Sequence, residues 1–198
     1  ADRRLDLREY DVAALLAYTA IRNNDKVGLI LFSDHVEKYV PPKKARGHGW
    51  RVIREILSFE PQGRQTDIAQ ALDYLARVVR KRCICFLLSD FMASGFEKPL
   101  RLSNKRHDVV AVSISDPREF ELPKVGFVEL EDAETGKDVL LDTNDRYLCK
   151  RYEKIRRQEV EDLQRLFRSM DLDSVSLSTH VSYTEPLLAF FRRREKRL

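Results

Sequence analysis

Three apolar segments of the sequence end in a Ser-Asp pair, and the carboxylates of these pairs are candidates for chemistry. The pairs close the stretches LFSD, LLSD and SISD, which places Asp34, Asp90 and Asp116 directly after apolar runs. Carboxylate oxygens are ligands that Mg²⁺ and Mn²⁺ prefer. Asp and Ser are also favoured in turns and at helix N-termini, where their role is structural. Both interpretations stay open for each aspartate, and Asp90 is the strongest functional candidate because it follows the most apolar segment.

The segments before these aspartates have the composition of strands buried on both faces of a parallel sheet. They read VGLILF in Val27–Phe32, CICFLL in Cys83–Leu88 and DVVAVSI in Asp108–Ile114. Nearly continuous apolar runs are typical of parallel strands that are covered by helices on both sides. Val36–Val40 instead alternates apolar and charged residues, which predicts a half-exposed edge strand that forms a hairpin with Val27–Phe32 and ends at Pro41.

Amphipathic or alanine-rich segments separate these strands and predict helices. Trp50 is expected as a buried indole at the start of its helix, and Thr66 as the N-cap of the next one. The longest helix is expected to bury an apolar stripe that includes Tyr147 and Ile155. The predicted helices are Leu7–Ile21, Trp50–Phe59, Thr66–Val79, Gly95–Ser103, Arg146–Met170 and Glu185–Arg194, and a short last strand is predicted at Ser174–Ser178.

Helices that alternate with buried strands predict an α/β fold with a doubly wound, mostly parallel, Rossmann-like sheet and an antiparallel edge strand. The length of 198 residues suits one domain spanning residues 1–198. Residues 119–142 differ, because alternating Val125–Leu130 and apolar Val139–Leu141 flank the turn-forming segment EDAETGK, and they predict an inserted β-hairpin. Ligands of open α/β sheets bind beyond the carboxyl ends of the strands, where the three aspartates are expected.

Composition narrows the function classes. No apolar run approaches the roughly 20 residues that cross a bilayer, and ADRRLDLREY at the start is not a secretory signal, so we expect this fragment to be cytoplasmic. Cys83, Cys85 and Cys149 are expected as core thiols, since they offer too few soft ligands for zinc. A net charge of +4 with interspersed signs does not predict nucleic-acid binding. The basic clusters at 41–46 and 192–197 are interpreted as solvated surface.

Five segments, in this order, together resemble one known family. They read AIRNNDKVGLILFSDHVEKYVPPKKARGH, GRQTDIAQAL, CICFLLSDF, ELEDAETGK followed by LLDT, and LLAFFRRR. They identify the chain as a member of the domain of unknown function 58 family, whose genes commonly lie beside those of MoxR-type AAA+ ATPases. The resemblance implies a von Willebrand factor A-like fold and, in metal-competent relatives, a metal-ion-dependent adhesion site. It also implies a membrane anchor upstream in the full-length protein.

In such a site an Asp-x-Ser-x-Ser loop after the first strand, a Thr from a second loop and an Asp from a third hold a divalent cation. Thr66 in GRQTDI matches the Thr, and Asp90 in LLSDF matches the Asp. The Asp-x-Ser-x-Ser loop is missing from the 198 residues. The resemblance therefore implies a domain that is incomplete at its N-terminus and lacks the strand between Val27–Phe32 and Cys83–Leu88.

Two expectations follow from the missing strand. Mg²⁺ or Mn²⁺ should bind to the full-length protein but not tightly to this fragment, because two oxygen ligands are far fewer than the six that Mg²⁺ requires. The two strands beside the gap should pair directly, borrow a strand from another copy to give a homo-oligomer, or make the fragment prone to aggregation.

The sequence favours a non-catalytic protein-interaction module that works with a MoxR-type AAA+ ATPase in a chaperone-like or assembly role. Asp34 and Asp116 would then belong to the binding edge of the sheet, beside a partial metal site of Thr66 and Asp90. The alternative is a divalent-metal-dependent nuclease or phosphohydrolase that uses Asp34, Asp90 and Asp116. A third hypothesis, nucleic-acid binding through the basic clusters, predicts affinity that falls steeply with salt.

Overall fold

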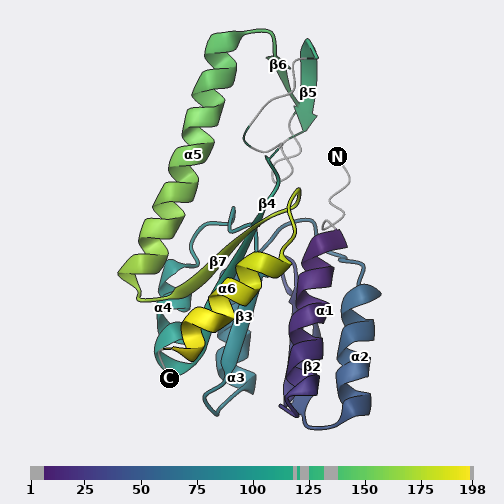
Figure 1. The fold of residues 1–198 in the computed structure, drawn as a ribbon. Coiled ribbons are helices and arrows are strands. Elements are labelled where there is room, and N and C mark those ends of the chain that lie inside the picture. Colours follow the sequence, from purple (N-terminus) through teal and green to yellow (C-terminus); the bar gives the residue numbers. More distant parts are fainter. Residues whose placement is uncertain (1–6, 118–119, 121–124, 132–137, 197–198) are drawn as a thin grey trace. The chain divides into compact units, whose positions relative to one another are not determined.

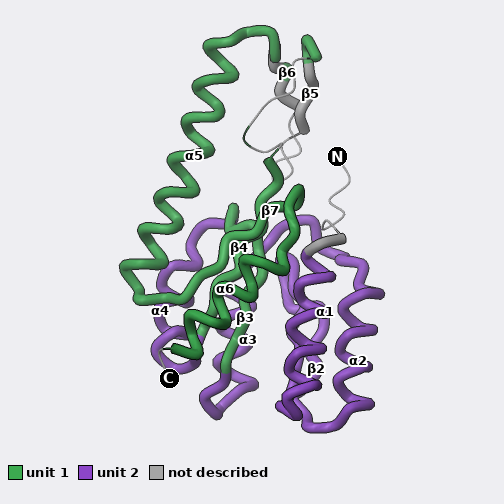
Figure 2. Tube along the Cα trace, in the orientation of Figure 1, with its two compact units in different colours: residues 1, 84–92, 109–198 green, residues 2–83, 93–108 purple. Residues whose placement is uncertain are grey.

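Helices and strands alternate along the chain, as the apolar patterns predict (Figure 1). The computed structural model describes residues 7–117, 120, 125–131 and 138–196. Its contacts divide the chain into two compact units (Figure 2). We call residues 2–83 and 93–108 the N-terminal unit, and residues 84–92 and 109–198 the C-terminal unit.

The N-terminal unit is a β-hairpin packed against helices. Its elements are α1 (Leu7–Arg22), β1 (Val27–Phe32), β2 (Val36–Lys43), α2 (Arg46–Leu57), α3 (Ile68–Val78) and α4 (Glu97–Arg106). β1 and β2 pair in antiparallel fashion, and α1, α2 and α3 each contact β1. The core that results contains Ala17, Val40, Val52, Ile53 and Ile56.

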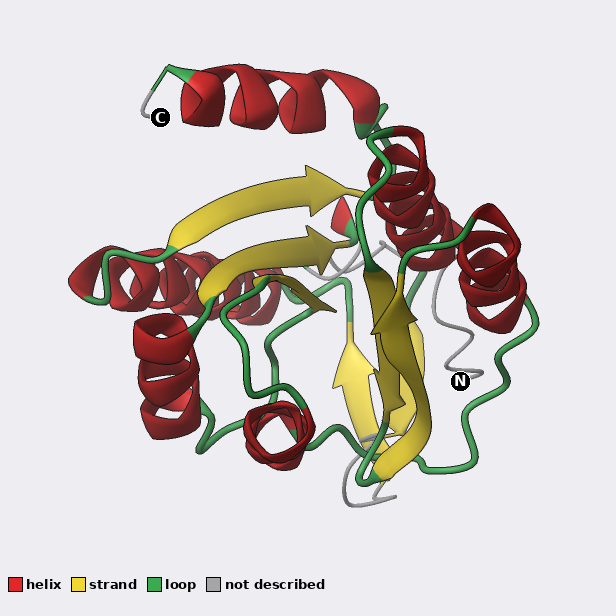
Figure 3. Cartoon of the chain, turned by 90° about the horizontal axis from the view of Figure 1, so that it is seen from below, coloured by secondary structure: helices red, strands yellow, loops and turns green. Residues whose placement is uncertain are grey.

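The C-terminal unit is built on a parallel sheet with the strand order β3-β4-β7 (Figure 3). β4 and β7 run parallel in an unbroken register from Val110 opposite Asp173 to Ser115 opposite Ser178. The elements are β3 (Ile84–Ser89), β4 (Asp108–Ser115), β5 (Phe127–Glu131), β6 (Asp138–Asp142), α5 (Arg146–Ser169), β7 (Asp173–Ser178) and α6 (Thr184–Glu195).

Two predictions about this unit are tested by its packing. β4 is buried along Val109–Val112, as its continuous apolar sequence predicts. The stripe predicted on α5 is wrong at Tyr147 and Ile155, which are exposed, and Phe167 is the buried residue of that helix. Phe167 packs edge-on against Phe91 with the ring centroids 5.1 Å apart. The amphipathic sequence of α5 is therefore used for packing chiefly in its last turns.

β5 and β6 pair in antiparallel fashion, from Phe127 opposite Asp142 to Glu131 opposite Asp138. They lie where the sequence predicts the two strands of an inserted hairpin. The described residues leave out part of the predicted region 119–142, namely residues 119, 121–124 and 132–137. Residue 118, just before the region, is also left out.

The apolar strands next to the predicted gap are less buried than predicted. VGLILF in β1 is half-buried or exposed at every position, and Ile84 at the start of β3 is 60% exposed. β1 has β2 as its strand neighbour and β3 lies at the edge of its sheet, over the described residues. An edge strand has one ladder open to further pairing, so both apolar strands keep the capacity to bind another strand.

The ends of three other segments also differ from prediction. β2 continues through Pro41 and Pro42 to Lys43, because a proline on an edge strand removes no ladder hydrogen bond. Trp50 is 57% exposed, since Gly49, Val52, Ile53 and Ile56 form the buried face of α2. The three cysteines are thiols rather than disulfides and are half-buried rather than core residues, and Cys83 precedes β3.

Gly28 tests how tightly the hairpin is built. A Cβ at Gly28 would lie 2.9 Å from both the Pro42 nitrogen and the Val40 oxygen, which are backbone atoms of β2. We expect Gly28→Ala to lower the free energy of unfolding by about 1–3 kcal/mol, because the backbone of β2 has to shift. Urea denaturation followed by circular dichroism measures the change.

Gly47→Ala is the matched control, because a Cβ at Gly47 on α2 meets nothing within 4 Å. It should leave the stability unchanged or raise it by up to about 1 kcal/mol, through helix propensity. Equal effects of the two substitutions would contradict the close approach of β1 and β2 at Gly28.

Candidate functional site

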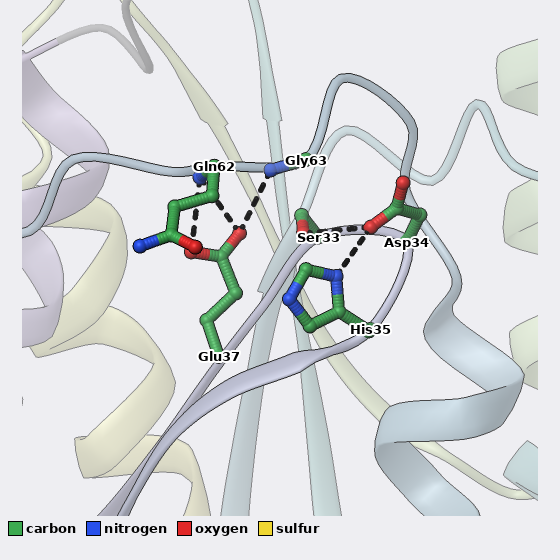
Figure 4. Close-up of polar contacts among 6 residues, drawn as sticks. All are labelled: Ser33, Asp34, His35, Glu37, Gln62 and Gly63. Atoms are coloured by element: carbon green, nitrogen blue, oxygen red, sulfur yellow. Dashed lines mark hydrogen bonds and ion pairs between the residues drawn. The ribbon is translucent and has the colours of Figure 1, made fainter.

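The turn between β1 and β2 carries an exposed acid and an exposed imidazole. The backbone N–H of Ser33 donates to the oxygen of His35, at 2.9 Å, and closes the turn. Oδ1 of Asp34 accepts a hydrogen bond from Oγ of Ser33, at 3.2 Å, and lies 2.6 Å from Nδ1 of His35 (Figure 4). The side chains of His35 and Asp34 are 51% and 46% exposed, while Ser33 is buried. The tip of the hairpin therefore presents a paired carboxylate and imidazole to solvent.

Residues 62–67, the loop before α3, hold this tip in place. The carboxylate of Glu37 accepts the backbone N–H groups of Gln62, at 3.0 Å, and Gly63, at 3.2 Å (Figure 4). The backbone N–H of Asp67 donates to the oxygen of Ser33, at 2.7 Å. A Cβ at Gly63 would lie 2.8 Å from Cβ of Ser33 and would also collide with the carboxylate of Asp34. Only glycine lets the two loops approach this closely.

Thr66 lies in this loop, directly before Asp67, the N-cap of α3. The N-cap of α3 is Asp67, whose Oδ1 accepts the backbone N–H of Gln70 at 2.8 Å, so the prediction that Thr66 is the N-cap was wrong. Asp is as good an N-cap as Thr, and the N-cap lies one residue later than predicted. Thr66 is half-buried. The bond between Asp67 and Ser33 brings its loop beside the turn that carries Asp34.

Both carboxylates of this site stay ionised at neutral pH. The hydrogen bond from His35 is the main cause that lowers the pKa of Asp34, and it outweighs the opposing effect of burial. Burial raises the pKa of Glu37, but the Ser33 side chain nearby and the hydrogen bonds from the N–H groups of Gln62 and Gly63 together outweigh it, and the net shift is downward. Hydrogen bonds to the charged form stabilise that form.

In the C-terminal unit, Asp90 begins the turn that follows β3. Its Oδ1 accepts the backbone N–H of Met92, at 3.0 Å, and lies 3.4 Å from Oγ of Ser89. Phe91 has a positive φ of 57° and is buried, so the turn is anchored next to an exposed aspartate. Asp90 is thus held at the carboxyl end of β3, where the sequence predicts it.

Asp116 follows β4 and contacts the residues after β7. Its Oδ2 accepts the hydroxyl of Thr179, at 2.9 Å, and its Oδ1 lies 3.8 Å from Nδ1 of His180. The register that places Ser115 opposite Ser178 brings these residues together. Asp90 and Asp116 therefore follow neighbouring strands of one parallel sheet, as predicted.

Sequence reasoning missed four residues that shape these sites. Glu37 and Gly63 act through contacts between segments that are 26 residues apart, and no local pattern announces them. Thr179 and His180 had a signal, because they follow the last predicted strand at the same point at which the aspartates follow theirs.

Within the described part of the chain, no three His, Cys, Asp or Glu side chains form a group that could hold a metal ion. No helix over those residues is both long enough and apolar enough to span a membrane.

Glu37→Gln tests the fastening of the hairpin tip. We expect the free energy of unfolding at pH 7 to fall by about 1 kcal/mol, because the two N–H groups lose a charged acceptor that is partly screened by solvent. Glu37 has a lowered pKa in the folded state, so its contribution is present above the unfolded pKa and is lost as the pH falls through the folded pKa. The difference between variant and wild type should therefore shrink in acid, as measured by urea denaturation at several pH values.

Glu60→Gln is the control, because Glu60 is an exposed carboxylate in the same unit. An equal loss of stability in the two variants, or a loss in Glu37→Gln that does not change with pH, would argue against this account.

Comparison with known proteins gives a family match and a fold match. Residues 7–162 match a family model described as "Protein of unknown function DUF58". Uncharacterized protein Mb1516 of Mycobacterium bovis is 35% identical over 134 residues, which are 65% of this chain and 42% of that protein. Uncharacterized protein MAV169 of Mycobacterium avium is 31% identical over 160 residues, which are 79% of this chain and 94% of that protein. The chain spans about two fifths of the length of the first of these relatives.

Among solved structures, the crystal structure of the conserved hypothetical protein BatB from Bacteroides thetaiotaomicron resembles this fold. The TM-score is 0.54 with 16% sequence identity, and the match covers 94% of this chain and 87% of BatB. At this identity the likeness extends to the fold alone.

Proposed function

The chain belongs to the family described as protein of unknown function DUF58, and from that premise we propose that it is a non-catalytic protein-interaction module. The observation that carries this proposal is the turn at Ser33, Asp34 and His35. Ser33 is buried and bonded within the turn, and its backbone oxygen accepts the N–H of Asp67 from the neighbouring loop, while the side chains of Asp34 and His35 face solvent. A rigid element that displays charges can bind a partner with little loss of conformational entropy.

Asp90 supports the same reading from the other unit. Its carboxylate is exposed, and the hydrogen bond from Met92 and the buried Phe91 hold the turn in one conformation. Asp116 is more engaged, since Thr179 and His180 contact it. We therefore propose Asp34 and Asp90 as the exposed contact residues and Asp116 as a residue that shapes its own loop.

The identity of the partner is proposed from the family resemblance. That resemblance implies a von Willebrand factor A-like fold, a MoxR-type AAA+ ATPase as partner, and a chaperone-like or assembly role. It also assigns Thr66 and Asp90 to an adhesion-type metal site and places a membrane anchor elsewhere in the full-length protein. The open edges of β1 and β3 support the further proposal that these strands pair with another strand, in a homo-oligomer or in the longer protein.

Binding to a MoxR-type ATPase encoded beside the gene is the direct test. We expect Asp34→Asn and Asp90→Asn each to weaken binding by about tenfold, because each removes a charge that contacts the partner. Calorimetry or biolayer interferometry with purified proteins measures the affinity. Asp73→Asn, at an exposed aspartate on α3, is the matched control and should bind like wild type. Undiminished binding by both test variants would exclude the strand-end turns as the contact surface.

Titration with Mg²⁺ or Mn²⁺ tests the metal site. We expect weak, millimolar binding to this chain, because Thr66 and Asp90 supply two of about six ligands that Mg²⁺ needs. Isothermal calorimetry on wild type, Thr66→Ala and Asp90→Ala measures it. Micromolar binding that survives both substitutions would show that other groups, such as Asp34 or Asp116, hold the ion.

A further inference from the structure

The face of the N-terminal unit formed by α1 and α2 exposes three large apolar side chains. Trp50 is 57% exposed, Leu57 is 58% exposed and Tyr18 is 40% exposed. The rings of Tyr18 and Trp50 lie 6.2 Å apart between centroids and are tilted by 54°. We call these three residues the aromatic patch. Single apolar residues are common on protein surfaces, but an exposed indole next to an exposed phenol on two packed helices forms a contiguous apolar patch, which is typical of a binding surface.

Arginines surround the aromatic patch at helical spacing. Arg46 and Arg54 lie four residues before and after Trp50 on α2, and Leu57 follows one turn after Arg54, so the four share one stripe of the helix. Arg22 lies four residues after Tyr18 on α1. All three arginines are exposed. Residues four apart lie on the same face of a helix, so the guanidinium groups border the apolar side chains.

The positive charge of this border is not neutralised from within. Among the described residues, Arg22, Arg46 and Arg54 have no ion pair, whereas Arg51 and Lys38 both pair with Glu55. Lys43 and Lys44, just before α2, are also exposed and add to the same sign. A cationic border of this kind is complementary to carboxylates.

The base of the patch is rigid. Gly49, beside Trp50, is buried where α2 approaches α1, and a Cβ there would collide with the side chain of Ile21. On the buried side of α2, Val52 and Ile56 are 1% and 2% exposed. Trp50 is thus held by packed helices and does not need to be ordered when a partner binds.

We propose that the aromatic patch docks an acidic segment of a partner protein that also carries apolar side chains. Trp, Tyr and Arg are the residue types that most often supply the energy of protein interfaces. Leu57 favours a protein segment over a nucleic acid, because a leucine in the stripe buries apolar side chains of a partner but makes no hydrogen bond to a base edge or a phosphate. This surface uses none of the strand-end aspartates, so its failure would leave the proposal for those turns untouched.

Trp50 is the one tryptophan of the chain, so its fluorescence reports on this surface directly. The probe is a blocked synthetic peptide of alternating glutamate and leucine without tryptophan. We expect a saturable shift of the Trp50 emission on titration with this peptide, and none with the peptide in which lysine replaces glutamate. Fluorescence anisotropy of the labelled peptide then measures affinity in variants that lack the indole.

Trp50→Ala and the double variant Arg46→Glu with Arg54→Glu should each weaken peptide binding by about tenfold or more. Arg101→Glu, at an exposed arginine on α4, is the matched control and should bind like wild type. Circular dichroism and urea denaturation establish that each variant is folded. Absence of a Trp50 response at millimolar peptide overturns the proposal, as does equal weakening by the control.

Two further titrations separate the competing partners. A single-stranded oligonucleotide or vesicles of anionic phospholipid, added to the same protein, should shift the Trp50 emission less than the acidic peptide at equal charge. Tighter binding of either one, lost in Trp50→Ala, would overturn the proposal in favour of a nucleic-acid or a membrane surface.

Discussion

The carboxylate of Glu37 is the interaction on which the geometry of the N-terminal unit depends. It joins β2 to the backbone N–H groups of Gln62 and Gly63, and so joins the hairpin to the loop that leads into α3. The bond from Asp67 to Ser33 runs between the same two segments. Each bond is worth little alone, but together they order two loops at once. The exposed Asp34 and the cap of α3 both derive their positions from this fastening.

The sequence predicts the helices and strands well because each has a local pattern. β1 and β4 show what such a pattern cannot tell. Both are apolar throughout, yet Val109–Val112 is buried in the centre of its sheet while Val27–Phe32 is half-buried beside one neighbour. A continuous apolar run shows that a strand is suited to burial on both faces. The number of neighbouring strands decides how much it obtains, and that number depends on pairing over long distances.

The candidate site, like the fold, was predictable from sequence where a local pattern marks its residues and not where contacts over long distances define them. Asp34, Asp90 and Asp116 follow apolar runs, so their places at strand ends could be inferred from sequence. Glu37 and Gly63 could not, since their importance comes from a contact across 26 residues. Trp50 was misplaced for a local reason: the helix begins at Arg46 rather than at Trp50, and the small residue Gly49 takes the buried position beside it. A glycine has no apolar side chain that would mark it as buried, so the sequence pattern predicts Trp50 on the buried face of the helix instead.

The two proposed surfaces differ in what they can contribute to binding. The carboxylate of Asp34 is already hydrogen-bonded to His35, so a cationic partner competes with an existing bond and gains only a modest net free energy. Charges of this kind chiefly raise association rates and reject wrong partners. The apolar side chains of Trp50 and Leu57 are more than half exposed, so a partner that covers them removes apolar area from water without breaking a hydrogen bond. The aromatic patch is therefore suited to set how long a complex lasts, and the strand-end turns to set how quickly and with which partner it forms.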